Sequence, residues 1–288
     1  MNTPRVTTVT VDLESGEPLY ITPLSDLHID SIDFDYPAFC STMRDRAKLP
    51  NHRAIIIGDV MDLVVPPDLK RWRASVQDRS IIGRDDWLNA AVDLAVERLV
   101  DVGVEYDLVG IGNHEDEFVK RHGVDTTSMI ARELRCARGG YSGYVEYIVR
   151  SKMAGGKISP TRRAPIFRIL YHHGAWGGRV QKGFGGARDF CRGFEGWQIF
   201  CYAHNHQTMV HREIRLRPKK GGGIVEYPVY IVCCGSWVHN YSEDAGVTHY
   251  AERAGHMPTG PQTPLIKLLC VNAGGDGGGW QLHYTVEV

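Results

Sequence analysis

The sequence has 288 residues, which is enough for one large α/β domain or two small ones. Hydrophobic residues make up 43% and charged residues 23%, the balance of an ordinary soluble globular protein. The formal net charge of -1 gives no global argument for a nucleic-acid or membrane partner and leaves only a local basic patch open.

Strands and helices alternate in the first half of the sequence. Residues 5–12 alternate in polarity and are rich in β-branched side chains, which predicts a half-buried strand. Further strands are expected at 19–23, 54–57 and 106–111, and helices at 37–48 and 85–102. Strands separated by helices predict parallel pairing with crossover connections.

The second half is richer in strands. A helix is expected at 126–138, before Gly139-Gly140. Strands follow with few helical periods between them, at 144–149, 166–171, 197–202, 208–216, 224–234, 264–271 and 279–287. With no repeat and no convincing linker, the sequence predicts an α/β fold in a single domain, 1–288, with two sheets.

The N-terminal stretch MNTPRVTTVTVDLESG has no charged start followed by an apolar run, so it is not expected to be a signal peptide. No apolar stretch approaches the ~20 residues of a membrane span. The seven cysteines are scattered without a C-x-x-C pair, which favours small reduced core residues over a disulfide framework. These features predict a cytoplasmic protein without a membrane partner.

Polar side chains follow five successive apolar segments, at the point where each segment ends. In open α/β sheets, ligands bind outside the carboxyl ends of the strands, so these side chains are expected to converge. Carboxylate, amide and imidazole groups suit Mn, Fe, Zn or a similar divalent ion, and their number exceeds the needs of one ion. The residues are Asp26 and His28, Asp59 and Asp62, Asn113 and His114, His172 and His173, and His204 and His206.

The order of these motifs resembles the calcineurin-like metallophosphoesterase superfamily. The motifs of that family read D-x-H, G-D-x-x-D, G-N-H-E/D, H-G and G-H-x-H. The matching stretches here are DLH at 26–28, GDVMD at 58–62, GNHED at 112–116, HG at 173–174 and AHNH at 203–206. The resemblance spans about residues 20 to 206. Ala203 replaces the usual glycine, which costs little if the backbone there is not at positive φ.

The resemblance implies a two-sheet α/β sandwich with two divalent metal ions at the C-terminal ends of the strands. Manganese is the expected metal, and Fe, Zn, Ni and Mg are alternatives. His172 competes with His173, which is preferred because the family's ligand histidine directly precedes glycine. The implied ligands are Asp26, His28 and His206 for one ion, Asn113, His173 and His204 for the other, and Asp59 as a bridge between them.

Two further residues take part in the implied chemistry. His114 is expected to act as general acid for the leaving oxygen, or as a cation that stabilises transition-state charge. Asp62 is expected to orient His114 by a hydrogen bond; a plain turn residue is the alternative.

The function that the resemblance implies is two-metal phosphoester hydrolysis, in which a metal-bridging hydroxide attacks phosphorus in line. Leu63-Val64 stands where the family's protein phosphatases carry arginine and glycine, so that class is disfavoured. The leading hypothesis is a phosphodiesterase or nuclease. A phosphomonoesterase acting on a nucleotide or small metabolite is the alternative, and a non-catalytic scaffold is the third hypothesis.

Three stretches are candidates for shaping the substrate site. The insertion at 66–88 interleaves basic residues with Trp72, which suits a nucleic-acid backbone but also a plain surface helix. The stretch 237–256, which includes the start of the C-terminal extension from about 240, is a candidate cap for the cleft; core packing and a dimer contact are the alternatives. The glycine-rich stretch 174–188, beside His173, is expected to bring backbone amides and the substrate-binding charges of Arg179, Lys182 and Arg188 to a phosphate; a flexible loop without such a role is the alternative.

Overall fold

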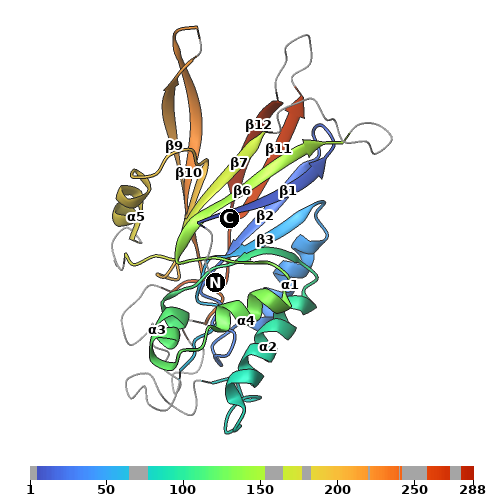
Figure 1. Ribbon diagram of the computed structural model, residues 1–288, viewed down its shortest axis with the longest axis vertical. Helices are drawn as coiled ribbons and strands as arrows, with labels where there is room; N and C mark the ends of the chain where they lie inside the picture. Colours follow the sequence, from blue (N-terminus) through green and yellow to red (C-terminus); the bar gives the residue numbers. More distant parts are fainter. Residues whose placement is uncertain are drawn as a thin grey trace.

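Two six-stranded sheets pack face to face and carry helices on their outer faces (Figure 1). The chain is a two-sheet α/β sandwich, as the sequence predicts. The computed structural model describes residues 5–64, 77–152, 165–176, 183–219, 221–239, 241, 258–272 and 280–288.

We name the sheet that packs against most of the helices sheet B. It contains four parallel strands. In spatial order these are β2 (Pro18–Leu24), β3 (His52–Ile56), β4 (Glu105–Val109) and β5 (Ala137–Arg138). Two antiparallel strands from the C-terminal part of the chain extend the sheet beyond β2, namely β11 (Leu265–Asn272) and β12 (Trp280–Glu287).

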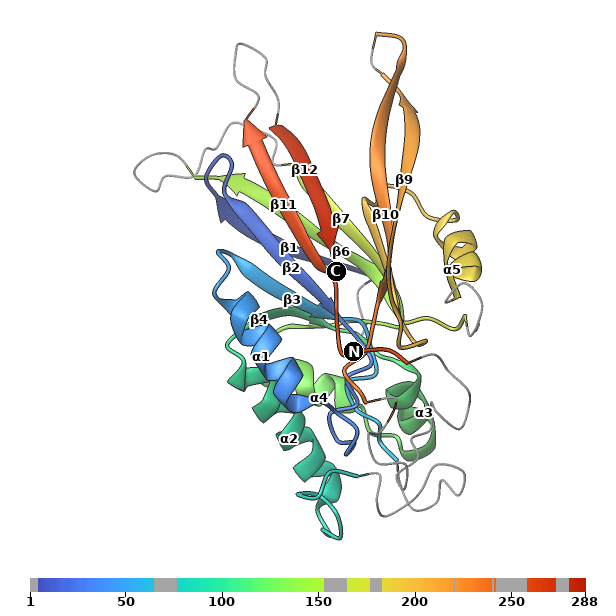
Figure 2. The same ribbon diagram turned by 180° about the vertical axis from the view of Figure 1, so that it is seen from behind.

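Sheet A is the second sheet and mixes parallel with antiparallel pairs. Its last two strands form a hairpin that extends beyond the rest of the molecule (Figures 1 and 2). The strands, in spatial order, are β1 (Val6–Leu13), β6 (Ser142–Ser151), β7 (Ile166–His172), β8 (Ile199–Tyr202), β10 (Ile224–Cys234) and β9 (Thr208–Pro218).

The core has three apolar layers because several strands are buried on both faces. In β3, Ile55 packs between the two sheets, whereas the next residue, Ile56, faces the helices. A strand buried on both faces reads as a continuous apolar run, as in Ala54-Ile55-Ile56-Ile57. The helices on sheet B are α1 (Tyr36–Ala47), α2 (Trp87–Asp101) and α4 (Thr126–Glu133), and α5 (Phe184–Cys191) covers the outer face of sheet A.

Helix starts follow simple capping chemistry. The Asp35 side chain accepts a hydrogen bond from the backbone N–H of Ala38 at 3.0 Å and so caps the start of α1, where Pro37 fits the first turn. Asp125 caps α4 in the same way through Ser128. These helices fix the outer layer against which the strands of sheet B are packed.

One expectation about helices was wrong. The helix expected over 126–138 ends at Glu133, because Arg135 takes a left-handed backbone (φ 55) and Ala137–Arg138 then pairs with β4. In the stretch 174–188, the residues from Phe184 onward belong to α5. Burial of Ala187 and Cys191 against sheet A outweighs the low helix propensity of the glycines in that stretch.

The cysteines agree with the prediction of small reduced core residues, since all seven are free and six of them are buried. Within the described ranges, no helix is long and apolar enough to cross a membrane. Of the expected insertion, residues 66–76 lie outside the described part of the chain, as do residues 240 and 242–257 of the C-terminal extension.

Candidate metal centre

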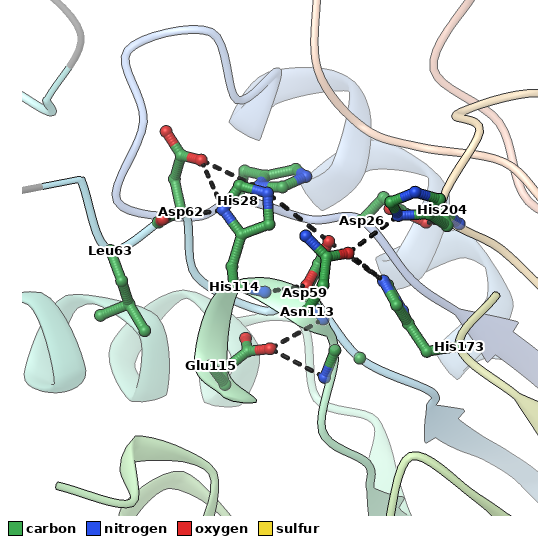
Figure 3. A network of polar contacts seen from close by, with 12 residues as sticks. Asp26, His28, Asp59, Asp62, Leu63, Asn113, His114, Glu115, His173 and His204 are labelled. Atoms are coloured by element: carbon green, nitrogen blue, oxygen red, sulfur yellow. Dashed lines mark hydrogen bonds and ion pairs between the residues drawn. The ribbon is translucent and has the colours of Figure 1, made fainter. Parts of the chain in front are cut away.

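The polar residues that follow five strands meet at one end of the sandwich (Figure 3). Loops after β2, β3 and β4 bring residues from sheet B, and loops after β7 and β8 bring residues from sheet A. The loops after β2 and β3 are joined by backbone hydrogen bonds, for example from Leu27 N–H to Asp59 O at 2.8 Å and from Ile29 N–H to Val60 O at 2.8 Å. The site is therefore built on paired backbone segments.

The side chains form groups with the geometry of metal ligands. Asp26, His28 and His206 form one group, and Asp59, His173 and His204 form another; within each group one ligand atom per residue lies within 4.8 Å of the others. A third group joins them through His28, Asp59 and His114. Among the described residues, the first two groups contain six of the seven expected ligands.

Asn113, the seventh expected ligand, belongs to the second group by contact. Its Oδ1 lies 2.9 Å from His173 Nε2 and 2.8 Å from His204 Nδ1. Asp59 Oδ2 lies 3.1 Å from the same His173 nitrogen. An amide oxygen, a carboxylate oxygen and two imidazole nitrogens therefore face one point, which is a donor set that suits a divalent ion.

Buried ligand atoms in the first group have unused hydrogen-bonding capacity. Asp26 Oδ1 and both ring nitrogens of His28 are buried and have no hydrogen-bond partner in the described part of the chain. His206 Nε2 lies 3.4 Å from Asp26 Oδ1, and Asp62 Oδ1 lies 3.4 Å from His28 Nδ1. Buried polar atoms are rarely left unsatisfied, so these residues fit a bound cation.

The backbone is strained at the same residues. Among the described residues, eight that are not glycine have positive φ, and five of those eight are expected metal ligands. Such conformations are rare for residues with a side chain and cluster at functional sites. The five ligands are Asp26 (φ 49), His28 (φ 49), Asp59 (φ 48), His204 (φ 77) and His206 (φ 57).

Close packing between loops also favours glycine at this site. A Cβ added at Gly112 would lie 2.1 Å from Asp59 Oδ1. Gly174 has φ +115, and a Cβ there would lie 2.5 Å from Ala203 O. Ala203 itself is not among the described residues with positive φ, so alanine causes no backbone strain at this position.

Electrostatics in the centre favour ionised carboxylates beside imidazoles. Burial raises the pKa of Asp59, but His173 and His114 outweigh burial and hold this pKa well below its usual range. Burial likewise lowers the pKa of His114, but Asp59 and Asp62 outweigh it and raise the pKa to about 10. The pKa of Asp62 is lowered because the nearby imidazoles of His114 and His28 outweigh burial. Buried anionic charge of this kind attracts cations.

His114 is placed by two residues outside its own helix, α3 (Asn113–His122). Its Nδ1 lies 2.8 Å from the Asp62 backbone oxygen and 2.9 Å from Asp62 Oδ1. Its backbone N–H donates to Asp59 Oδ1 at 3.0 Å, and its Nε2 lies 3.8 Å from Asp59 Oδ2. Because both neighbours of Nδ1 are acceptors, Nδ1 carries the proton and Nε2 faces the centre.

Glu115 follows His114 in the stretch GNHED at 112–116, and the sequence alone assigns no role to it. Glu115 is fully buried, and its carboxylate accepts hydrogen bonds from the backbone N–H groups of Gly112 (2.9 Å), Met61 (3.0 Å) and Asp59 (3.1 Å). Burial and the nearby Asp59 raise the pKa of Glu115 to about 7. The residue ties the loop after β3 to the loop after β4, and only its motif position hinted at this.

His172 and His173 point to different surroundings. His173 is fully buried in the metal-ligand group. His172 packs against Trp176 and Phe190, and its Nδ1 accepts a hydrogen bond from Gly174 N–H at 2.8 Å. Burial and the neighbouring His173 lower the pKa of His172 to about 4. The structure therefore places His173, and not His172, among the candidate ligands.

The expected substrate residues are placed only in part. Arg179 and Lys182 lie outside the described residues. Arg188 lies on α5, where its Nε donates to Glu213 on β9 at 2.6 Å. A Cβ at Gly183 would lie 2.2 Å from Trp176 O and 3.2 Å from Asn205 Nδ2, so the two ends of the segment 177–182 lie close together, beside the H-x-H motif.

Comparison with known proteins gives limited information. No model of a known protein family matches the sequence, and no curated protein matches it significantly. Among solved structures, Vps29 from Chaetomium thermophilum is 12% identical over 93% of this chain and 95% of that chain, with a TM-score of 0.35. The same protein complexed with the RaPID-derived cyclic peptide RT-D3 is 11% identical over 94% and 96%, with a TM-score of 0.34. At these TM-scores neither match bears on the function of this chain.

Proposed function

We propose that the protein is a two-metal-dependent phosphoester hydrolase that acts on phosphodiesters. The observation that carries this proposal is the pair of ligand groups on either side of Asp59, one with His28 and Asp26 and the other with His173 and His204. Two divalent ions held this way would lower the pKa of a water molecule and neutralise charge on a phosphoryl group. The resemblance of the motif order to calcineurin-like metallophosphoesterases supports the same proposal.

The ligand roles follow the two groups. Asp59 is within reach of both because it belongs to the group of His173 and to the group of His28 and His114. Manganese is the proposed metal, since carboxylate, amide and imidazole donors without thiolate suit it. The proposed ligands are Asp26, His28 and His206 on one side, Asn113, His173 and His204 on the other, and Asp59 between them.

His114 is the proposed proton donor to the leaving oxygen. Its Nδ1 is held by the carbonyl and carboxylate of Asp62, which leaves Nε2 facing the centre. The side chain of His114 is 16% exposed, so a substrate can reach it from solvent. Asp59 and Asp62 favour the protonated ring, which can give a proton to the leaving group or stabilise developing negative charge.

A phosphodiester is the proposed substrate class, in nucleic acid or in a nucleotide. The chain lacks the arginine that the family's protein phosphatases carry after the second aspartate of the G-D-x-x-D motif, since Leu63 is there. The chain also has histidine at position 114, which is the proposed proton donor to the leaving oxygen. A phosphomonoesterase acting on a nucleotide or small metabolite is the second candidate, and a cytoplasmic location is proposed with both.

The experiment that tests the proposal is hydrolysis of bis-p-nitrophenyl phosphate and p-nitrophenyl phosphate by protein stripped with a chelator and reloaded with one metal at a time. We expect the stripped protein to be inactive and Mn to restore the most activity. Preference for the diester supports a phosphodiesterase or nuclease, and preference for the monoester moves the phosphomonoesterase to first place. Full activity without metal contradicts the proposal, and stable metal binding without turnover of either ester indicates a scaffold.

A further inference from the structure

Asp30 is a buried acid beside the centre that belongs to none of the metal-ligand groups found in the described residues. It stands two residues after His28 on the loop that follows β2, and it is 2% exposed. Its Oδ1 accepts a hydrogen bond from Asp62 N–H at 2.5 Å, and its Oδ2 accepts one from Leu63 N–H at 2.9 Å. One carboxylate therefore binds two consecutive backbone N–H groups of the loop after β3.

The backbone that Asp30 binds is in a strained conformation. Leu63 has φ 52, a left-handed conformation that a side chain with a Cβ adopts only at a cost. Consecutive N–H groups next to a left-handed residue form a concave anion-binding site, and the Asp30 carboxylate occupies it. Both oxygens of the Asp30 carboxylate accept hydrogen bonds from this backbone, so the carboxylate fixes the orientation of both N–H groups.

Asp30 is itself held in place from outside the centre. The backbone N–H of Asp78 donates to Asp30 O at 2.8 Å. Arg98, on α2, joins the segment that contains Asp30 to the segment that contains Asp78. It donates hydrogen bonds to Ile29 O at 2.8 Å and to Asp78 Oδ2 at 2.6 Å. The carboxylate that holds the Asp62 backbone is therefore anchored to sheet B and its helices.

The conformation that Asp30 holds determines what His114 meets. The two acceptors on His114 Nδ1 are the backbone oxygen and the side-chain Oδ1 of Asp62, at 2.8 and 2.9 Å. Both can point at one nitrogen only while the Asp62–Leu63 backbone keeps its present turn. A change in that turn would misdirect Nε2, the atom that faces the centre.

We propose that Asp30 is a positioning residue for His114, acting through the backbone of Asp62 and Leu63. It keeps both Asp62 acceptors on Nδ1, so that the Nε2 proton points at the leaving oxygen. This inference rests on the proposed function, and it predicts a defect in proton donation while the metal ligands stay in place.

Leaving-group dependence separates positioning from a structural role. Bis-p-nitrophenyl phosphate releases a good leaving group that needs little protonation, whereas diphenyl phosphate releases a poor one that depends on a proton donor. A residue that acts through His114 should matter more for diphenyl phosphate. A residue that only stabilises the fold should affect both substrates alike.

The main variant is Asp30→Asn, in which one acceptor becomes an NH2 group that faces a backbone N–H. The matched control is Asp107→Asn on β4, the same substitution at a buried aspartate that pairs with Arg53 and Tyr147 instead of the centre. Asp30→Ser, which keeps a single acceptor, replaces the main variant if that protein does not fold. All proteins are assayed with Mn bound, and their metal content is measured.

We expect Asp30→Asn to lower kcat for diphenyl phosphate about tenfold or more, which is a part of the roughly 100-fold or larger contribution of general acid catalysis, and kcat for bis-p-nitrophenyl phosphate less than about threefold. Two ions per chain should remain, and Asp107→Asn should leave the ratio of the two rates unchanged. In a His114→Ala background, Asp30→Asn should add no further loss on diphenyl phosphate. Equal losses on both substrates, or additive losses in that background, would overturn the proposal.

Nuclear magnetic resonance of the histidine ring nitrogens gives a readout that does not need activity. The protein is labelled with 15N-histidine and loaded with Zn, and the His114 signals are identified by their absence in His114→Ala. We expect a hydrogen-bonded Nδ1–H in the wild type and its loss in Asp30→Asn; an unchanged signal overturns the positioning role. If wild-type protein hydrolyses neither ester with any metal, the proposed function fails and this spectrum alone decides the role of Asp30.

Discussion

The two sheets contribute different chemistry to the candidate metal centre. Among the described residues, sheet B supplies every carboxylate of the candidate ligand groups, after its parallel strands. The candidate ligands that sheet A supplies from the same part of the chain are imidazoles, after β7 and β8. In Figure 3 the two contributions face each other. From sheet B come Asp26, His28, Asp59, Asp62, Asn113 and His114, and from sheet A come His173, His204 and His206.

Sheet B therefore supplies the negative charge of the candidate centre, and sheet A supplies further imidazole ligands. On the sheet B side, buried Glu115 binds backbone N–H groups of two loops, so the anionic side chains are held before any ion arrives. The sheet A histidines reach across to that framework, where His204 N–H donates to Asp26 Oδ2 at 3.1 Å and the His204 ring meets Asn113. We therefore expect substitutions on the sheet B side to cost more.

The largest effect is expected at Asp59, which belongs to the group of His173 and His204 and to the group of His28 and His114. Asp59→Asn removes a negative charge and an anionic ligand from both proposed ions. We expect both ions to be lost and hydrolysis to fall to the level of chelated protein, far beyond the roughly 10- to 100-fold loss typical of an indirect contact to a metal. Metal content by mass spectrometry and the bis-p-nitrophenyl phosphate assay measure the two losses.

Asp107→Asn controls for removal of a buried acid from sheet B. Asp107 is 6% exposed and accepts hydrogen bonds from Arg53 and Tyr147, away from the candidate ligands. This variant should keep both ions. If Asp59→Asn also keeps two ions, Asp59 is not the bridge and the division between the sheets loses its central residue.

His114→Ala should separate chemistry from metal binding on the sheet B side. We expect kcat for diphenyl phosphate to fall about 100-fold or more, because general acid catalysis typically contributes at least that much, and kcat for bis-p-nitrophenyl phosphate to fall less, while two ions remain bound. The assay is kcat on both esters together with metal content. Loss of an ion in this variant would show instead that His114 is a ligand, in keeping with its place in the group of His28 and Asp59.

His206→Ala tests the sheet A side and should have a smaller effect. Replacement of His206 removes no anionic ligand, and the His206 side chain is 32% exposed, so water can take its place as a ligand. We expect one of two ions to bind more weakly and activity to fall about tenfold, a loss that excess Mn partly restores. A loss as complete as that of Asp59→Asn would remove the proposed difference between the two sheets.

The position of the candidate site was predictable because strand ends are visible in a sequence. The apolar run Ala54-Ile55-Ile56-Ile57 ends directly before Gly58-Asp59, and parallel strands place such ends at one edge. The pattern also predicted strands β11 and β12, although it did not show that they extend sheet B beyond β2.

Other parts of the site depend on contacts that the sequence does not record. Glu115 and Asp30 act on backbone N–H groups, which look alike at every position of a sequence. Helix α5 forms despite Gly185-Gly186 because its apolar residues are buried on sheet A, so packing overrides propensity. The sequence likewise does not record which of the adjacent residues His172 and His173 points into the ligand group, because the surrounding packing decides this.

The smallest predicted effect concerns stability at the other end of sheet B, remote from the ligands. His52 begins β3, where its Nε2 lies 2.8 Å from Thr22 Oγ1, and burial together with the nearby Arg46 lowers its pKa to about 4. In the unfolded chain this pKa is about 6.5. Between those two values the unfolded chain binds a proton that the folded protein does not, so the free energy of unfolding should fall as the pH drops from 6.5 towards 4.

Urea unfolding at pH 7 and pH 5 measures this change, and His52→Gln provides the comparison because glutamine does not titrate. We expect the variant to lose less stability than the wild type between the two pH values. Both proteins carry the same candidate metal centre, so acid effects on its residues cancel in the difference. Equal losses in the two proteins would mean that the acid sensitivity of sheet B arises at the candidate metal centre and not at the start of β3.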